Sequence, residues 1–157
     1  MVRWLLAAVH LLALGIGLGS VWARARLLGA PTLDGPTLRG PLDLVVVDDD
    51  LGGPYPPGPS DWVHQVLGMN RIGRYDGGSR VVLAFAEPRA WKGRSGFGAV
   101  SRDALANAVP GADLIVLFGH PRLLQELPTD APVLLAWHRQ RLMQEAVGRW
   151  LVRRLRD

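Results

Sequence analysis

The sequence predicts an α/β protein, with a small layered parallel sheet of about four strands preceded by an N-terminal hydrophobic helix. Two observations support this fold class. Four short apolar runs rich in β-branched residues are typical of strands buried on both faces. Segments with helical patterning alternate with these runs, and such alternation predicts right-handed crossovers between parallel strands.

The N-terminal hydrophobic segment runs from Trp4 to Trp22, nineteen residues without a formal charge, and Arg24 and Arg26 follow it. A helix of this length would be about as long as the hydrocarbon thickness of a bilayer. Its terminal tryptophans stand where interfacial aromatics anchor a span. Residues 1–28 therefore predict a transmembrane helix or uncleaved signal anchor in a single-pass membrane protein. The alternative is a cleaved leader, which would make the chain secreted or periplasmic.

Residues 29–41 are rich in glycine and proline and lack apolar periodicity, which predicts a linker. The remaining residues, 42–157, are expected to form one α/β domain. Its predicted strands are residues 42–47, 80–86, 113–118 and 132–137, and its predicted helices are residues 60–69, 101–109, 121–126 and 139–156. Together these elements predict a flavodoxin-like α/β/α sandwich.

The last predicted helix has two distinct faces. One face is apolar and is expected to pack on the sheet. The other is mainly basic, which is ordinary for a solvated helix face but could also touch anionic lipid. The apolar ridges are Met143, Val147, Leu151 and Leu155, and beside them Leu142, Ala146 and Trp150; the charged face carries Arg141, Glu145, Arg149, Arg153 and Arg156.

Composition and missing motifs exclude several kinds of site. The chain has no cysteine, so it has no disulfide and no thiolate metal site. Its net charge of +4 comes from 18 basic residues, all but one of them arginine, which are scattered except at the C-terminus, so we expect no nucleic-acid binding. No GxxxxGK[ST], GxGxxG or GxSxG motif is present, and we predict no cofactor.

Ligands of open parallel sheets bind beyond the carboxyl ends of the strands. The polar residues at the four predicted ends are therefore the candidate binding residues: Asp49, Asp50, Glu87, Arg89, Trp91, Lys92, His120 and His138. Trp91 and Trp137 could stack on a sugar or equally could cap the core. His64, in a predicted helix, is more typical of a packing histidine than of a catalyst.

The three consecutive acids Asp48 to Asp50 could bind Mg²⁺, as in phosphotransfer receivers. However, the next strand is followed by Glu87 where a phosphoacceptor aspartate would be needed, and His120 is a softer ligand. We therefore predict no metal site.

The segment "GADLIVLFGHPRLLQELPTDAPVLLAWHRQRLMQEAVGRWL" resembles the C-terminal α/β sandwich of glycoside hydrolase family 3, particularly its β-N-acetylhexosaminidase-like branch. The segments "VVVDDDLGGPYPP" and "VVLAFAEPRAWKGRSG" resemble the first two strand-loop units of that sandwich. The resemblance covers about Pro41 to Arg154. It implies that the strand-exit loops face a partner barrel. The short stretch of residues 61–78 further predicts that one strand of the usual sandwich is missing, with a stub near residues 71–75.

The resemblance also implies limits on catalysis. The family takes its aspartate nucleophile from a (β/α)₈ barrel, and these 157 residues cannot form one. The glucosidase-like branch takes its acid/base from the sandwich, but here the expected position falls at about Trp91 or Lys92, so Glu87 is only a weak catalytic candidate. We therefore expect an accessory domain related to hydrolysis of O-glycosyl compounds, inactive alone, that binds carbohydrate or a barrel-bearing partner. The alternative is a receiver-like or structural interaction module without sugar chemistry.

Overall fold

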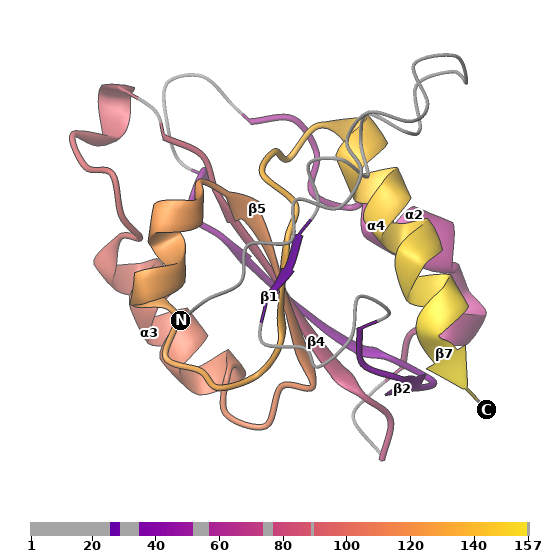
Figure 1. Ribbon diagram of the computed structural model, residues 1–157. Helices are drawn as coiled ribbons and strands as arrows, with labels where there is room; N and C mark the ends of the chain where they lie inside the picture. Colours follow the sequence, from indigo (N-terminus) through magenta and orange to yellow (C-terminus); the bar gives the residue numbers. More distant parts are fainter. Residues whose placement is uncertain (1–25, 29–34, 52–56, 74–76, 89, 157) are drawn as a thin grey trace.

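The computed structural model describes residues 26–28, 35–51, 57–73, 77–88 and 90–156 (Figure 1). The hydrophobic segment Trp4 to Trp22, predicted to span a membrane, lies outside the described residues, as does Arg89. Within the described part of the chain, no helix is long and apolar enough to cross a membrane.

The centre of the fold is a five-stranded sheet in the order β1-β6-β5-β4-β3. Four of its strands are parallel to one another, which confirms the predicted parallel sheet. The fifth, β1, was not predicted as a strand; it pairs antiparallel with β6 at the edge of the sheet. The strands are β1 (Arg26–Leu28), β3 (Asp43–Asp48), β4 (Arg80–Ala86), β5 (Leu114–Gly119) and β6 (Val133–Leu135).

Helices cover both faces of this sheet (Figure 1). Helices α2 (Trp62–Leu67) and α4 (Arg141–Arg154) pack on one face. Helix α3 (Ala99–Ala108) and the 3₁₀ helix η3 (Pro121–Glu126) pack on the other. Two further 3₁₀ turns, η1 (Met69–Arg71) and η2 (Ala90–Lys92), lie in the connections before and after β4. The predicted α/β layering is therefore present.

Each face of the sheet has its own apolar core. Along β4, Leu83 and Phe85 point toward α2 and α4, whereas Val82 and Ala84 point toward α3. All four side chains are fully buried. This explains why the sequence of β4 is continuously apolar instead of alternating, because both faces of a central parallel strand are covered.

Strand β3 does not share this double burial, although its sequence predicts it. Because β3 is the last strand in the sheet order, only β4 pairs with it along its full length. Val46 is 39% exposed, whereas Val47 is buried. A run of valines predicts a strand well, but it does not reveal whether that strand lies at the centre or at the edge.

The chain steps in one direction from β3 through β4 to β5, yet α2 and α3 lie on opposite faces of the sheet. The reason lies on the outer side of β3, where Ile72 forms an isolated parallel bridge with Leu42. This bridge corresponds to the stub predicted near residues 71–75. The chain forms one residue of pairing where a further strand would lie and then continues to β4.

The end of α4 also differs from its prediction. The helix stops at Arg154, because the chain then extends into β7 (Leu155–Arg156), which pairs parallel with β2 (Leu38–Arg39). Leu38 is fully buried, so the segment predicted as a linker contains a short strand packed on the core. Leu142, expected in an apolar ridge, is 59% exposed, whereas Ala146 and Trp150 of the same ridge are buried in the core.

Candidate functional site

The carboxyl ends of β3, β4, β5 and β6 meet at one edge of the sheet, as the parallel topology requires. Two groups of side chains lie there. The first is an ion network, buried except for the exposed Arg94, called here the aspartate network: Asp48, Asp49, Asp50, Lys92, Arg94 and Arg139. The second is an open hollow, called here the rim pocket: Glu87, Pro88, His120, Trp137 and His138.

Arg139 is the centre of the aspartate network, with a side chain only 4% exposed. Its two terminal nitrogens donate to the two carboxylate oxygens of Asp48 over 2.9 and 2.8 Å, a bidentate pair. One of them also donates to Asp50 over 2.8 Å, and the guanidinium binds the carbonyl oxygen of Gly58. Burial alone would lower the pKa of Arg139, but the hydrogen bonds to Asp48 and Asp50 outweigh it and raise the pKa.

Lys92 and Arg94 bind the other side of the network. The ammonium of Lys92 lies 2.9 Å from Asp49 and 2.5 Å from Asp50, and Arg94 donates to Asp49 over 2.9 Å. The N–H of Gly98, at the start of α3, also donates to Asp49 over 2.8 Å. Burial alone would raise the pKa of Asp49, but the hydrogen bonds from Gly98, Lys92 and Ser101 hold it below its ordinary value.

The aspartate network is closed to a cation. Every carboxylate oxygen of the three aspartates accepts at least one hydrogen bond, and three cationic side chains balance the three negative charges. In the described ranges, no group of three or more acidic or histidine side chains could hold a metal ion. The network instead ties the end of β3 to the loop after β4 and to the start of α4.

The rim pocket is an open cavity of about 270 Å³ beside this network. Glu87 connects the two, because its backbone N–H donates to Asp50 and its carboxylate accepts the backbone N–H of Arg139 over 3.3 Å. The pocket therefore has a carboxylate on one wall whose position is set by the buried ions behind it.

Trp137 stands on the edge of the rim pocket in an unusual backbone conformation. Its φ is +59°, and the N–H of His138 donates to the carbonyl of Ala136 over 2.6 Å, so Trp137 is the central residue of a tight three-residue turn. A tryptophan in the left-handed region is strained, and such strain gathers at functional sites. The turn leaves the indole 37% exposed, in edge contact with His120 at a centroid distance of 6.3 Å.

The turn after β5 has no room for a side chain at Gly119. A Cβ atom there would lie 2.6 Å from the carbonyl oxygen of Ala86, so the glycine allows the ends of β4 and β5 to meet. Next to it, Nδ1 of His120 accepts the N–H of Arg122 over 3.1 Å and caps η3. When the imidazole is neutral, the proton is on Nε2, which can donate to a ligand.

The structure divides the predicted binding residues into two sets. Asp49, Asp50 and Lys92 are in the closed network, whereas Glu87, His120 and His138 line the pocket. Trp91 is half-buried beside Lys92, and its buried indole nitrogen has no hydrogen-bond partner among the described residues.

Sequence reasoning missed the roles of Arg94 and Arg139. The signal for Arg139 was its position, since it follows the last predicted strand and so lies at the same edge as three acids. Trp137 was noticed as an aromatic strand end, but its strained turn could not be anticipated from the sequence.

The rim pocket can bind a neutral polar ligand by hydrogen bonds and stacking, but it does not contain a catalytic pair. Glycoside hydrolysis uses two carboxyl groups on either side of the scissile bond. Of the described residues, Glu87 alone contributes a carboxylate to the pocket, because the aspartates behind it are neutralised. Comparisons with protein families, curated proteins and solved structures found no match to this chain.

Proposed function

We propose that the chain is a membrane-anchored carbohydrate-binding domain related to the C-terminal sandwich of family 3 glycosidases. The observation that carries this proposal is Trp137, held by a strained turn at the edge of a pocket that also contains Glu87 and His120. An exposed indole packs against the CH groups of a pyranose. The carboxylate and imidazole can hydrogen-bond to its hydroxyl groups, as in small-ligand sites with a few placed polar groups.

The arrangement of the elements supports the same relationship. Helices on both faces, and a one-residue bridge at Ile72 where another strand would lie, are what a flavodoxin-like sandwich that has lost one strand would have. The turn Gly119-His120-Pro121 and the strand end at Trp137 fall where the resemblance to the family is strongest. A barrel-bearing glycosidase that docks on this edge would be the natural protein partner.

The domain is proposed to be accessory rather than catalytic. Its pocket has one carboxylate, and the nucleophile of the related enzymes comes from a barrel. Purified chain is therefore expected not to hydrolyse aryl glycosides. Robust turnover that disappears in Glu87→Gln would contradict the accessory role.

Sugar titration tests the binding itself. Full-length chain in nonionic detergent would be titrated with monosaccharides and with N-acetylglucosamine disaccharide, followed by tryptophan fluorescence. We expect saturable binding that weakens about tenfold in Trp137→Ala, because stacking on one ring contributes up to about 1.5 kcal/mol beyond the burial of its area. Trp62→Phe is the matched control, since Trp62 lies under Arg141 and is not among the residues that line the pocket. Absence of saturation with every sugar, or equal binding by Trp137→Ala, would refute the proposal.

A further inference from the structure

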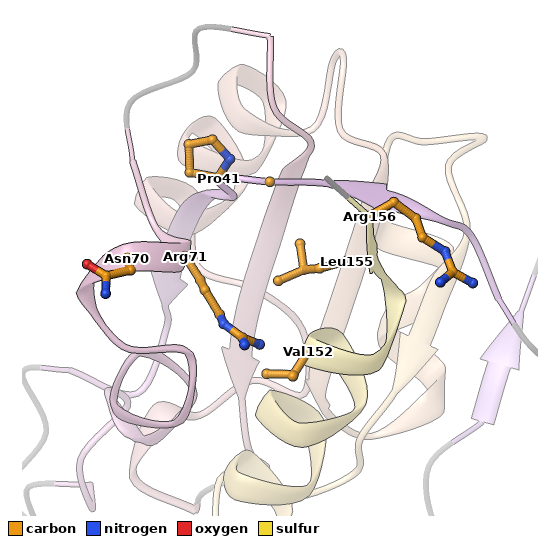
Figure 2. A pocket seen from close by; sticks show the side chains of 7 residues that line it. Pro41, Asn70, Arg71, Val152, Leu155 and Arg156 are labelled. Atoms are coloured by element: carbon orange, nitrogen blue, oxygen red, sulfur yellow. The ribbon is translucent and has the colours of Figure 1, made fainter.

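A second cavity, of about 470 Å³, lies at the opposite end of the sheet from the rim pocket (Figure 2). Its walls come from three places that are distant in sequence: the chain just before β3, the 3₁₀ turn η1, and the end of α4 with β7. We call it the amino-end pocket. Its lining residues are Gly40, Pro41, Asn70, Arg71, Val152, Leu155 and Arg156.

Among the described residues, no acidic side chain forms an ion pair with the arginines of the amino-end pocket. Arg71 and Arg156 lie on either side of Leu155 (Figure 2), and both are exposed. Arg39 is the register partner of Arg156 on β2, which brings a third guanidinium to this end. Of the described residues that line the pocket, none carries a carboxylate. The arginines of the aspartate network, in contrast, are each paired with an acid.

The rest of the lining also fits a compact anion. Val152, Leu155 and Pro41 supply apolar walls, and the side-chain amide of Asn70 supplies further donors. Guanidinium groups bind phosphate oxygens with paired, charge-assisted hydrogen bonds. We propose that the amino-end pocket binds the phosphate group of a small phosphorylated ligand.

The path of the chain favours a soluble ligand over a lipid headgroup. In the register of β1 with β6, Arg26 is opposite Leu135, near the rim end of the sheet, and Leu28 is opposite Val133. The chain therefore enters β1 at the rim end of the sheet. Three residues separate Trp22 from Arg26, so the two residues can be at most about 14 Å apart. A bilayer at Trp22 would lie near the rim, and the amino-end pocket would face away from it.

Phosphate titration tests this proposal independently of sugar binding. Full-length chain would be titrated with inorganic phosphate and with glycerol 3-phosphate at constant ionic strength, followed by calorimetry and by the arginine Nε–H resonances. We expect saturable binding that weakens about tenfold in Arg71→Gln and in Arg156→Gln, since each removes a charge-assisted hydrogen bond. Arg102→Gln is the control, because Arg102 is exposed on α3, on the other face of the sheet.

Three outcomes would overturn the proposal. The first is that neither phosphate compound saturates the chain. The second is that Arg102→Gln weakens phosphate binding as much as Arg71→Gln and Arg156→Gln do. The third is that chloride binds as tightly as phosphate, which would mean unspecific charge attraction. To distinguish a lipid headgroup from a soluble ligand as the source of the phosphate, the phosphate titration would be repeated in nanodiscs of phosphatidylcholine with and without phosphatidylglycerol. Equal phosphate affinity in both discs is expected. Loss of phosphate binding only in anionic discs, in wild type, would show that lipid headgroups occupy the pocket and would refute a soluble ligand.

Discussion

Arg139 joins parts of the chain that are distant in sequence, because its guanidinium reaches Asp48, Asp50 and the carbonyl of Gly58. A buried ion pair is weak support for overall stability, since desolvation offsets much of the attraction. Removing one charged residue of the network has a larger effect on stability, because the remaining charged side chains stay buried without a partner. The network therefore matters most for the position of the strand ends and, through Glu87, for the wall of the rim pocket.

Arg139→Met is expected to lower the free energy of unfolding by about 3–5 kcal/mol, because Asp48 and Asp50 lose their buried counter-charge. Urea denaturation at neutral pH measures this. Arg141→Met is the matched control: Arg141 is exposed, its carboxylate partner is Glu145 on its own helix and its guanidinium lies over the ring of Trp62, so a loss of about 1 kcal/mol is expected. Equal effects of the two substitutions would contradict a structural role for the network.

Asp49 predicts a dependence of stability on pH. Its pKa is lower in the folded chain than its ordinary value of 3.8, so the unfolded chain binds the proton more tightly. The stabilisation is therefore complete above about pH 4 and is lost as the pH falls below that value through the folded pKa. Asp49→Asn should flatten the acid side of the curve of unfolding free energy against pH. An unchanged slope between about pH 2 and 4 would show that other carboxylates dominate acid unfolding.

At the scale of elements, α2 and α4 pack closely because Gly148 has no side chain. A Cβ atom at Gly148 would lie 2.7 Å from the Cβ of Val66, a distance that packed side chains do not tolerate. Glycine within a helix is otherwise unfavourable, so this residue is explained by the contact between the two helices.

Gly148→Ala is expected to destabilise the chain, because overpacking costs about 1–3 kcal/mol and the better helix propensity returns at most about 1 kcal/mol. In a Val66→Gly background the Cβ and both methyl groups that clash are absent, and the same substitution should become neutral or stabilising. A double-mutant cycle of unfolding free energies measures this coupling. Additive effects would mean that α2 and α4 do not approach as closely as described.

For the whole molecule, the two ends of the parallel sheet have different characters. The carboxyl end has a closed ion network and the rim pocket, and the amino end has an open pocket rich in arginine. If Trp4 to Trp22 spans a bilayer, the register of β1 brings the carboxyl end close to the membrane surface.

Because the chain has no cysteine, single labels can test this orientation. Nitroxide would be attached to Arg122→Cys, at the rim end, and to Asn70→Cys, at the amino end, in chain reconstituted into nanodiscs. The label at position 122 is expected to be closer to the headgroups, as measured by relaxation from a lipid-attached Gd³⁺ chelate. Stronger relaxation at position 70 would reverse the proposed orientation and would also remove the argument for a soluble ligand in the amino-end pocket.

Whether the sequence could predict a feature depends on how far apart in the chain the interacting residues are. The strands 80–86 and 113–118 were predicted because a strand covered on both faces needs a continuous apolar run, which is a local property. The edge position of β3 and the pairing of β2 with β7 were not predicted, because they depend on neighbours far away in the chain. Arg26–Leu28 was assigned to the N-terminal helix, because three residues carry too little pattern to indicate a strand.

The sequence by itself determined the α/β class, the four parallel strands and the gathering of polar residues at their carboxyl ends, since periodicity and strand order act through local patterning. Only the tertiary structure decided what those polar residues do. Arg139, 89 residues from Asp50, closes the acidic triplet, and the turn at Trp137 opens the rim pocket. The physical reason is that the role of a buried charged side chain depends on which opposite charge lies next to it in the folded chain. The exposure of an indole depends likewise on the backbone conformation of its residue.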